Sequence, residues 1–164
     1  MVEIAAIRPA ADGDRGAVWS IIEPIIRAGE TYALDRDMTE AAALAYWLGE
    51  DRATFVAELS GAVVGTYYLK RNQMGGGSHI ANCGYAVSIK AQGRGIARAM
   101  ALHSLAQAKS RGFAAMQYNF VVATNVGAIH LWETLGFETL VRLPKAFDHP
   151  REGLVDACLM WRDL

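Results

Sequence analysis

Cysteine and proline are scarce in this sequence, and neither sign of charge is in excess. Its 164 residues include two cysteines and four prolines, and the formal net charge is −1. Cys83 and Cys158 form no Cys-x-x-Cys pair, which argues against a zinc ribbon or a disulfide scaffold. A nearly neutral chain also lacks the positive field that favours nucleic acid. We therefore expect no metal and no nucleic-acid partner.

Long apolar runs are missing too. No stretch reaches the roughly 18 apolar residues that a membrane-spanning helix requires, so no membrane partner is expected. The first ten residues contain Glu3 and no basic segment before an apolar run, so we expect no signal peptide. Because both cysteines stand in apolar segments, we expect buried free thiols in a cytoplasmic protein.

The composition of the chain is that of an ordinary globular protein. Hydrophobic residues make up 52% of it and charged residues 20%, which argues against disorder. A chain of this length buries one substantial core but is short for two. We expect a single domain spanning residues 1–164.

The spacing of apolar and turn residues predicts a series of strands and helices. Asp12 is expected to cap the first helix, and Pro24 to kink or divide it. Pro144 and Pro150 are expected in a loop between the last two strands. The order of elements indicates an α/β protein (α+β in the stricter sense) with a mixed sheet and helices on its faces. The expected strands cover residues 2–8, 54–59, 62–70, 80–89, 114–122, 137–142 and 154–161, and the expected helices cover about 13–28, 40–48, 98–111 and 125–135.

The most informative segment runs from Ile80 to Lys109. An apolar strand leads into Gln92-Gly-Arg-Gly-Ile-Ala97, and a long helix follows. Backbone N–H groups at a glycine-rich helix start bind phosphate because they lack helical partners and lie at the positive end of the helix dipole. Arg98 stands where a dinucleotide-binding fingerprint has its third glycine, and no Gly-Lys-Ser/Thr follows. Alone, the segment indicates either a phosphate-bearing ligand or an ordinary strand-to-helix turn.

A second segment narrows that choice. Residues 125–137 read Asn-Val-Gly-Ala-Ile-His-Leu-Trp-Glu-Thr-Leu-Gly-Phe. Together with the earlier Gln-x-x-Gly-x-Ala, they resemble the two signatures of the GNAT N-acetyltransferase superfamily, and the resemblance covers nearly the whole chain. It implies a mostly antiparallel sheet of about seven strands, splayed between the fourth and fifth, with helices on both faces. It also implies acetyl-CoA as the cosubstrate.

The resemblance assigns roles along the acetyl-CoA site. Backbone N–H groups of residues 94–98 would hold the pyrophosphate, and Val87 and Ile89 would pair with the pantetheine as an added strand does. A backbone N–H near Val87 would stabilise the oxyanion. Asn125 would bind the pantetheine arm, cap the following helix, or do both. The full expected set is Val87, Ile89, Gln92, Gly93, Arg94, Gly95, Ile96, Ala97, Arg98 and Asn125.

The acid that protonates the departing thiolate is missing from its usual place. Many members of the superfamily have a tyrosine where this chain has Trp132. An indole N–H donates a hydrogen bond but is far too weak an acid to give up its proton. Either water assists the thiolate or another group serves. Tyr85 and Tyr118 are candidates on residue type alone.

Two asparagines in apolar strands bear on the acceptor. The segments around Asn82 and Asn119 resemble a branch that includes fungal acetyltransferases of proline analogues, in which matching asparagines bind the substrate. Pairing with neighbouring backbone is the alternative for both. Tyr32 is a further candidate for substrate binding, and Glu30 is either a base for the amine or a solvated loop acid.

The sequence therefore predicts an acetyl-CoA-dependent N-acetyltransferase in which a small amine, such as an amino acid or an analogue, attacks the thioester directly. Acetylation of a protein N-terminus or a lysine is one alternative. A non-catalytic acyl-CoA-binding sensor is another, from a different class. The last two strands are a common pairing surface in the superfamily, which favours a homodimer.

Overall fold

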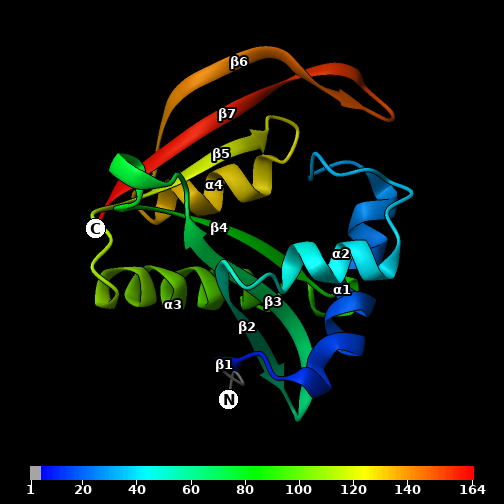
Figure 1. The fold of residues 1–164 in the computed structure, drawn as a ribbon. Helices are drawn as coiled ribbons and strands as arrows, with labels where there is room; N and C mark the ends of the chain where they lie inside the picture. The colour runs from blue at the N-terminus through cyan, green and yellow to red at the C-terminus, as the bar shows by residue number, and fades with distance from the viewer. Residues whose placement is uncertain (1–4) are drawn as a thin grey trace.

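Seven strands form one mixed sheet in the computed structural model, which describes residues 5–164 (Figure 1). Their spatial order is β1-β2-β3-β4-β5-β7-β6, and every neighbouring pair except β4–β5 is antiparallel. The expected mixed, mostly antiparallel sheet is confirmed. The strands are β1 Ala6–Pro9, β2 Arg52–Leu59, β3 Ala62–Arg71, β4 Ile80–Val87, β5 Ala115–Val122, β6 Glu138–His149 and β7 Gly153–Asp163.

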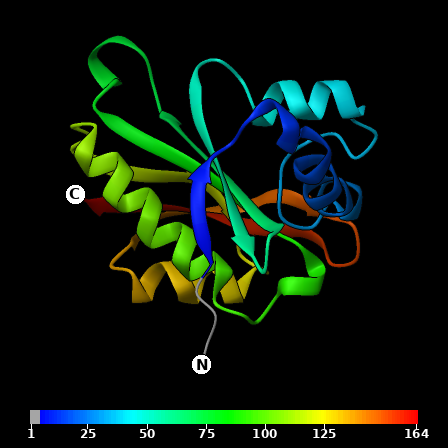
Figure 2. The same cartoon turned by 90° about the horizontal axis from the view of Figure 1, so that it is seen from below.

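Helices cover both faces of the sheet. Helices α1 (Arg15–Ala28) and α2 (Glu40–Trp47) lie on one face, and α3 (Ile96–Ser110) and α4 (Val126–Thr134) lie on the other (Figure 2). Each layer closes over its own apolar core, because each helix turns one stripe of apolar side chains toward the strands. No helix within residues 5–164 is both long and apolar enough to cross a membrane.

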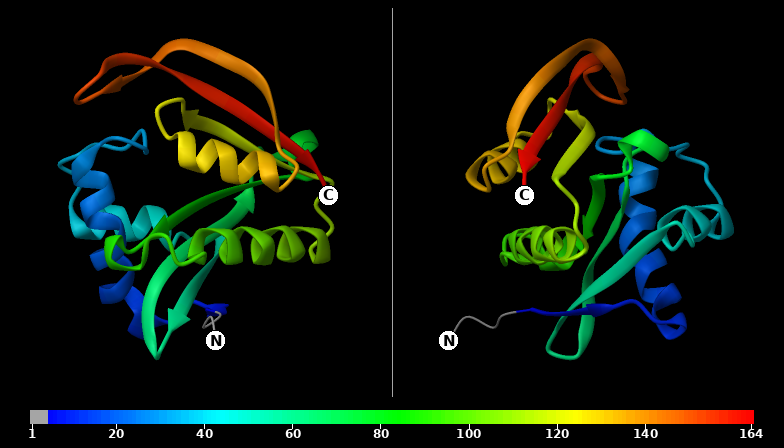
Figure 3. Two further views of the ribbon diagram at one scale, coloured as in Figure 1. Left: turned by 180° about the vertical axis from the view of Figure 1, so that it is seen from behind. Right: turned by 60° about the vertical axis from the view of Figure 1, so that its left-hand side comes forward.

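The sheet divides between β4 and β5. The two strands pair in parallel only at Ile80–Ala115 and Ala81–Met116, and Figure 3 shows them diverging from that point as two arms. The register of β5 with β7 also shifts between Tyr118 and Val121, and such a bulge re-aims nearby side chains. The expected splaying between the fourth and fifth strands is confirmed, and it leaves one edge of β4 without a neighbouring strand.

Some expected boundaries near the N-terminus are wrong. Strand β1 ends at Pro9, and residues 2–4 of the expected first strand lie outside the described residues. Asp12 does not cap α1, because it lies in a 3-10 turn and the helix begins three residues later. The carboxylate of Asp14 instead accepts from the N–H of Ala11 at 2.7 Å and pairs with Arg8. Pro24 does not divide α1, which is continuous.

Two strand ends also differ from expectation. Strand β6 continues to His149, so Pro144 lies inside a strand and not in a loop. An edge strand tolerates proline, and the register with β7 shifts between Leu143 and Phe147 to accommodate it. Strand β4 ends at Val87, so Ile89 lies in a 3-10 turn over residues 89–91 instead of on the strand.

Candidate functional site

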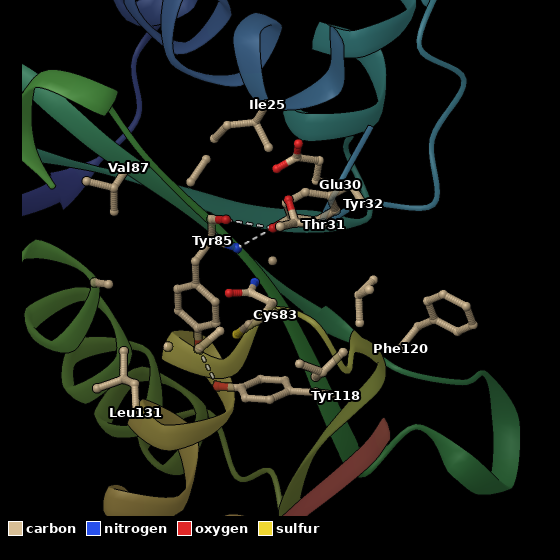
Figure 4. Close-up of a pocket in the computed structure, with 18 of the residues that line it drawn as sticks. Ile25, Glu30, Thr31, Tyr32, Cys83, Tyr85, Val87, Tyr118, Phe120 and Leu131 are labelled. Atoms are coloured by element: carbon tan, nitrogen blue, oxygen red, sulfur yellow. Dashed lines mark hydrogen bonds between the residues drawn. The ribbon is translucent and has the colours of Figure 1, made fainter. Parts of the chain in front are cut away.

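A cavity of about 800 Å³ lies in the gap between the diverging strands β4 and β5 (Figure 4). Its walls come from the open edge of β4, from β5, from the connector between α1 and α2, and from the starts of α3 and α4. This volume suits a cofactor-sized ligand. Among the described residues that line it, Glu30 alone carries a side chain that is charged at neutral pH.

The start of α3 forms one end of the cavity. Gly93 and Gly95 adopt left-handed φ values of 74° and 78°, which favour glycine, and the helix begins at Ile96. The first helical hydrogen bond is donated by the N–H of Ala99 to the carbonyl of Gly95 at 3.0 Å. The N–H groups of residues 96–98 therefore have no partner within the helix and are available to a ligand.

The start of α4 adjoins the same cavity. Asn125 occupies the N-cap position, where its side chain makes no capping hydrogen bond, and it lines the cavity beside Gly127. Arg98 of α3 donates to the hydroxyl of Thr134 on α4 at 3.2 Å, which ties the two helices together. Two helix N-termini, each the positive end of a helix dipole, thus lie at one cavity.

A side chain from the α1–α2 connector satisfies part of the open edge of β4. The Tyr32 hydroxyl donates to the Tyr85 carbonyl at 2.7 Å and accepts from the Tyr85 N–H at 2.8 Å, as Figure 4 shows. Backbone groups on one edge of a strand recur every second residue. The next groups on this edge are therefore those of Val87, which lines the cavity where the strand ends.

Asn82 and Asn119 both line the cavity but have different partners. The buried Asn82 donates its side-chain N–H to the carbonyl of Gln117 at 2.9 Å, one residue beyond the last β4–β5 pair. Its amide oxygen remains for another donor. The exposed Asn119 accepts from Gln117 Nε2 at 2.8 Å and donates to Asn72 Oδ1 at 2.7 Å. Asn82 therefore joins the strands at the point of division, and Asn119 lies at the rim.

Tyr85 and Tyr118 meet across the gap. Their hydroxyl oxygens are 2.8 Å apart, and the Tyr85 hydroxyl is 2.7 Å from Ser104 Oγ on α3. Both rings pack against Trp132, with ring centroids 5.0 Å from it in each case. Burial raises the pKa of both phenols well above the usual value, so both stay protonated near neutral pH.

Cys83 lies two residues before Tyr85 on β4 and also lines the cavity. The side chain is buried and forms no disulfide. Burial raises the pKa of its thiol to about 12. Because the thiolate is the nucleophilic form of cysteine, this protonated thiol is a poor nucleophile.

Glu30 lies at the mouth of the cavity and is already paired. Its Oε1 lies 2.8 Å from Nη2 of Arg151, a residue of the turn between β6 and β7. The connector and this turn approach the mouth from opposite arms of the sheet (Figure 3). Because the Arg151 side chain is exposed and the Glu30 side chain is partly exposed, the pair adds little to folding stability, but it bridges the mouth.

The structure brings most of the predicted site residues together. Tyr32, Asn82 and Asn119 line the cavity, although the Tyr32 hydroxyl is bonded to β4. Arg94, Gly95, Ile96 and Arg98 lie in the turn before α3 and its first helical turn without lining the cavity. The predicted acetyl-CoA residues that line it are Val87, Ile89, Gln92, Gly93, Ala97 and Asn125.

Sequence reasoning misses two residues of this arrangement. Ser104 is fully buried on the apolar side of α3, and a serine at such a position is the one signal that could reveal it. Arg151 follows Pro150 in a polar turn. Nothing in the sequence pattern places it beside Glu30.

Comparison with protein families gives one match that covers most of the chain. Residues 19–137 match the model of the acetyltransferase (GNAT) family. N-acetyltransferase aca1 from Schizosaccharomyces pombe is 33% identical over 128 residues, which are 68% of this chain and 61% of that protein. The chain therefore matches less than two thirds of the length of this relative.

Many solved structures match the fold, and several cover nearly the whole chain. A GCN5-related N-acetyltransferase from Kribbella flavida is 37% identical, with a TM-score of 0.94 and 98% of both chains covered. A phosphinothricin acetyltransferase from Sinorhizobium meliloti, solved in complex with AcCoA, has a TM-score of 0.85 at 22% identity. That match covers 100% of this chain and 89% of the other, and at this identity it shows the fold alone.

Proposed function

The chain belongs to the acetyltransferase (GNAT) family, and from this premise we propose that it transfers the acetyl group of acetyl-CoA to the amine of a small molecule. The proposed acceptor is an amino acid or an analogue of one. The observation that carries the proposal is the cavity in the divided sheet, which joins two helix starts to a mostly uncharged chamber. The helix starts suit phosphates, and the chamber suits a thioester and a neutral amine.

The acetyl-CoA half of the proposed site combines a phosphate turn with an open strand edge. The N–H groups of residues 96–98 bind the pyrophosphate, and Gln92, Gly93, Arg94 and Gly95 form the turn that exposes them. Val87 pairs with the pantetheine as an added strand would. Ile89 contacts the pantetheine from the exposed 3-10 turn. Asn125 binds the pantetheine with its side chain, which makes no capping hydrogen bond to α4.

The proposed chemistry is direct attack in a ternary complex. A route through an acetylated cysteine would need Cys83 as a thiolate, and the raised pKa of this thiol opposes that form. The amine therefore attacks the thioester itself. The N–H of Val87, on the open edge of β4, stabilises the oxyanion that forms.

The acceptor half of the proposed site orients the amine with uncharged groups. Asn82 accepts an N–H of the amine with its side-chain oxygen, because its nitrogen is held by Gln117. Asn119 contacts the rest of the acceptor at the rim, and the Tyr32 ring forms part of the wall. Glu30 takes the amine proton, directly or through water, once the acceptor disturbs its pair with Arg151.

The lining also limits the size and charge of the acceptor. No lysine or arginine is among the described residues that line the cavity, so a carboxylate would be held by amide N–H groups or by Arg151 at the mouth. A peptide would have to pass the Glu30–Arg151 pair that bridges this mouth. These features favour a small acceptor over a protein N-terminus or a lysine side chain.

The proposed function is tested by titrating the protein with acetyl-CoA and then measuring thiol release with a panel of amines. The panel holds proline and its ring analogues, other amino acids, their decarboxylated amines, and short peptides. We expect acetyl-CoA binding, thiol release above background with a small amine, and intersecting double-reciprocal plots. Binding without release for any amine would favour the sensor, and a preference for peptides would contradict a small acceptor.

Gly95→Asp is expected to weaken acetyl-CoA binding by about tenfold or more, because it places a carboxylate beside the phosphates. Titration calorimetry measures the affinity. Gly61→Asp is a matched control, since Gly61 has a similar φ of 77°, equally open surroundings and a place in the distant β2–β3 turn. The control should bind like the wild type. Equal affinities for the two variants would overturn the phosphate-turn assignment.

Asn119→Ala is expected to lower kcat/KM for the best amine by about tenfold while the KM for acetyl-CoA stays unchanged, because the variant loses an acceptor contact only. Asn72→Ala is the matched control. It removes the partner of Asn119 Nδ2 and leaves Asn119 in place, and should change kcat/KM much less. If Asn119→Ala stays within about twofold of wild type, Asn119 does not orient the acceptor.

We further propose that the protein is a homodimer that pairs through the β6–β7 arm. Strand β6 lies at the edge of the sheet and is largely exposed along its length. The exposed apolar side chains on this arm are Leu140, Val141, Leu143 and Leu154. A long edge strand with exposed apolar side chains favours pairing with another chain.

The double variant Leu140→Glu and Leu154→Glu is expected to convert the dimer to a monomer, because it places charges in the apolar contact. Light scattering after size exclusion measures the mass. Leu102→Glu is the control, since Leu102 is also exposed but lies on α3, and this variant should remain dimeric. A wild-type protein with the mass of a monomer would contradict the proposal.

A further inference from the structure

One proton of the proposed reaction has no donor yet. When the C–S bond breaks, the sulfur of CoA keeps the electron pair and requires a proton. Trp132 lines the cavity, but its indole N–H is not acidic enough to supply one. Two phenols, those of Tyr85 and Tyr118, pack against this indole in the gap between the strands.

The hydrogen bonds of these phenols have a defined direction. The Ser104 hydroxyl donates to the carbonyl of Ala101, which can only accept, at 2.7 Å. Since its single proton is used, Ser104 Oγ accepts from the Tyr85 hydroxyl. The Tyr85 proton is then used as well, so the Tyr85 oxygen accepts from Tyr118. The hydroxyls thus form a series of hydrogen bonds in which Tyr118 donates to Tyr85, Tyr85 donates to Ser104, and Ser104 donates to the backbone of α3.

Tyr118 is the terminal donor of this series of hydrogen-bonded hydroxyls. The Tyr85 hydroxyl is enclosed by Ser104, by Tyr118 and by the sulfur of Met116 at 3.9 Å. Within the described part of the chain, the Tyr118 hydroxyl has one hydrogen-bond partner, Tyr85. Its proton can therefore rotate away while the Tyr85 oxygen stays anchored to Ser104.

We propose that Tyr118 is the catalytic acid that protonates the leaving CoA thiolate, and that Tyr85 and Ser104 are the positioning residues that hold its hydroxyl in place. This inference rests on the proposed acetyl transfer. The C–S bond breaks, sulfur takes the bonding pair, and the phenolic proton of Tyr118 moves to sulfur to form the thiol. Glu30 takes the proton that the attacking nitrogen loses and passes it through water to the phenolate, which restores the phenol. Amine and thioester thus become amide and thiol without any other reactant.

Burial supports this assignment. The desolvation that raises the pKa of Tyr118 keeps the phenol protonated before the reaction. Desolvation beside this buried phenol also makes a thiolate that forms there more basic, which favours proton transfer from the phenol. The stacked ring of Phe137, 4.3 Å from the Tyr118 ring between centroids, holds the phenol on its strand.

Tyr118→Phe is expected to lower kcat by about 100-fold or more, in line with the loss of a general acid. The KM for acetyl-CoA should stay within about threefold, because the ring still packs against Trp132 and Phe137. Tyr85→Phe and Ser104→Ala should each lower kcat by about tenfold with little change in KM, since they leave the acid present but poorly held. The kcat and the KM of the wild type and of the three variants are measured from thiol release with the best amine.

Tyr67→Phe is the matched control. Tyr67 is fully buried, its hydroxyl bonds to His103 Nδ1 at 2.7 Å, and its ring packs against Tyr85. It does not line the cavity. Losing this phenol should lower the thermal midpoint about as much as Tyr118→Phe does and leave kcat within about twofold of wild type.

These experiments distinguish failure of the Tyr118 proposal from failure of the proposed function. A folded Tyr118→Phe with kcat within about threefold of wild type overturns the proposal, and so does an equal kcat loss in Tyr67→Phe. If Tyr118→Phe does not fold, Ser104→Ala decides, and an unchanged kcat there overturns the series of hydrogen-bonded hydroxyls. A wild-type protein that binds acetyl-CoA but releases no thiol with any amine contradicts the proposed function itself. The wild type alone tests this point, and the variants test the role of Tyr118.

Discussion

Unpaired backbone groups on a buried strand edge are costly, and this molecule is built around one such edge. Strands β4 and β5 share two residue pairs and then separate. Beyond that point, Asn82 adds one bond to the opposite strand, and the Tyr32 hydroxyl satisfies both backbone groups of Tyr85. The next backbone groups on this edge after Tyr85 are those of Val87, which lines the cavity as Ala97 of α3 does. A ligand that pairs like a strand gains most at this position.

Connections across the division tie the proposed acceptor site to the proposed acetyl-CoA site. The connector between α1 and α2 supplies Tyr32 to the edge of β4 and Glu30 to the ion pair with Arg151. One short segment therefore contacts β4 on one arm and the β6–β7 turn on the other. The same segment therefore links the β6–β7 turn to the backbone of Tyr85, two residues before the proposed oxyanion donor.

Local signals in the sequence predicted most of the strands and helices and the glycine-rich turn before α3, because these depend on neighbours in the chain. Gly93 and Gly95 are one such signal, and both adopt the left-handed φ that favours glycine. The division of the sheet was implied by the resemblance to the GNAT superfamily. Contacts between distant segments could not be predicted in this way: Glu30 with Arg151, and Ser104 with Tyr85. Boundaries failed where context overrides propensity. Pro144 indicates a loop, yet the edge position of β6 permits a strand.

Trp132 occupies the position at which the resemblance to the superfamily implies a tyrosine, so the proposed proton donor must come from elsewhere. In the proposed mechanism the acid belongs to β5 instead of α4, and it directly precedes Asn119 in the chain. In a regular strand, adjacent side chains point to opposite faces. The register shift between Tyr118 and Val121 relaxes this rule, and both residues line one cavity. A single bulge thus adjoins both the proposed proton donor and the amide proposed to orient the acceptor, so changing its geometry should alter both proposed roles together.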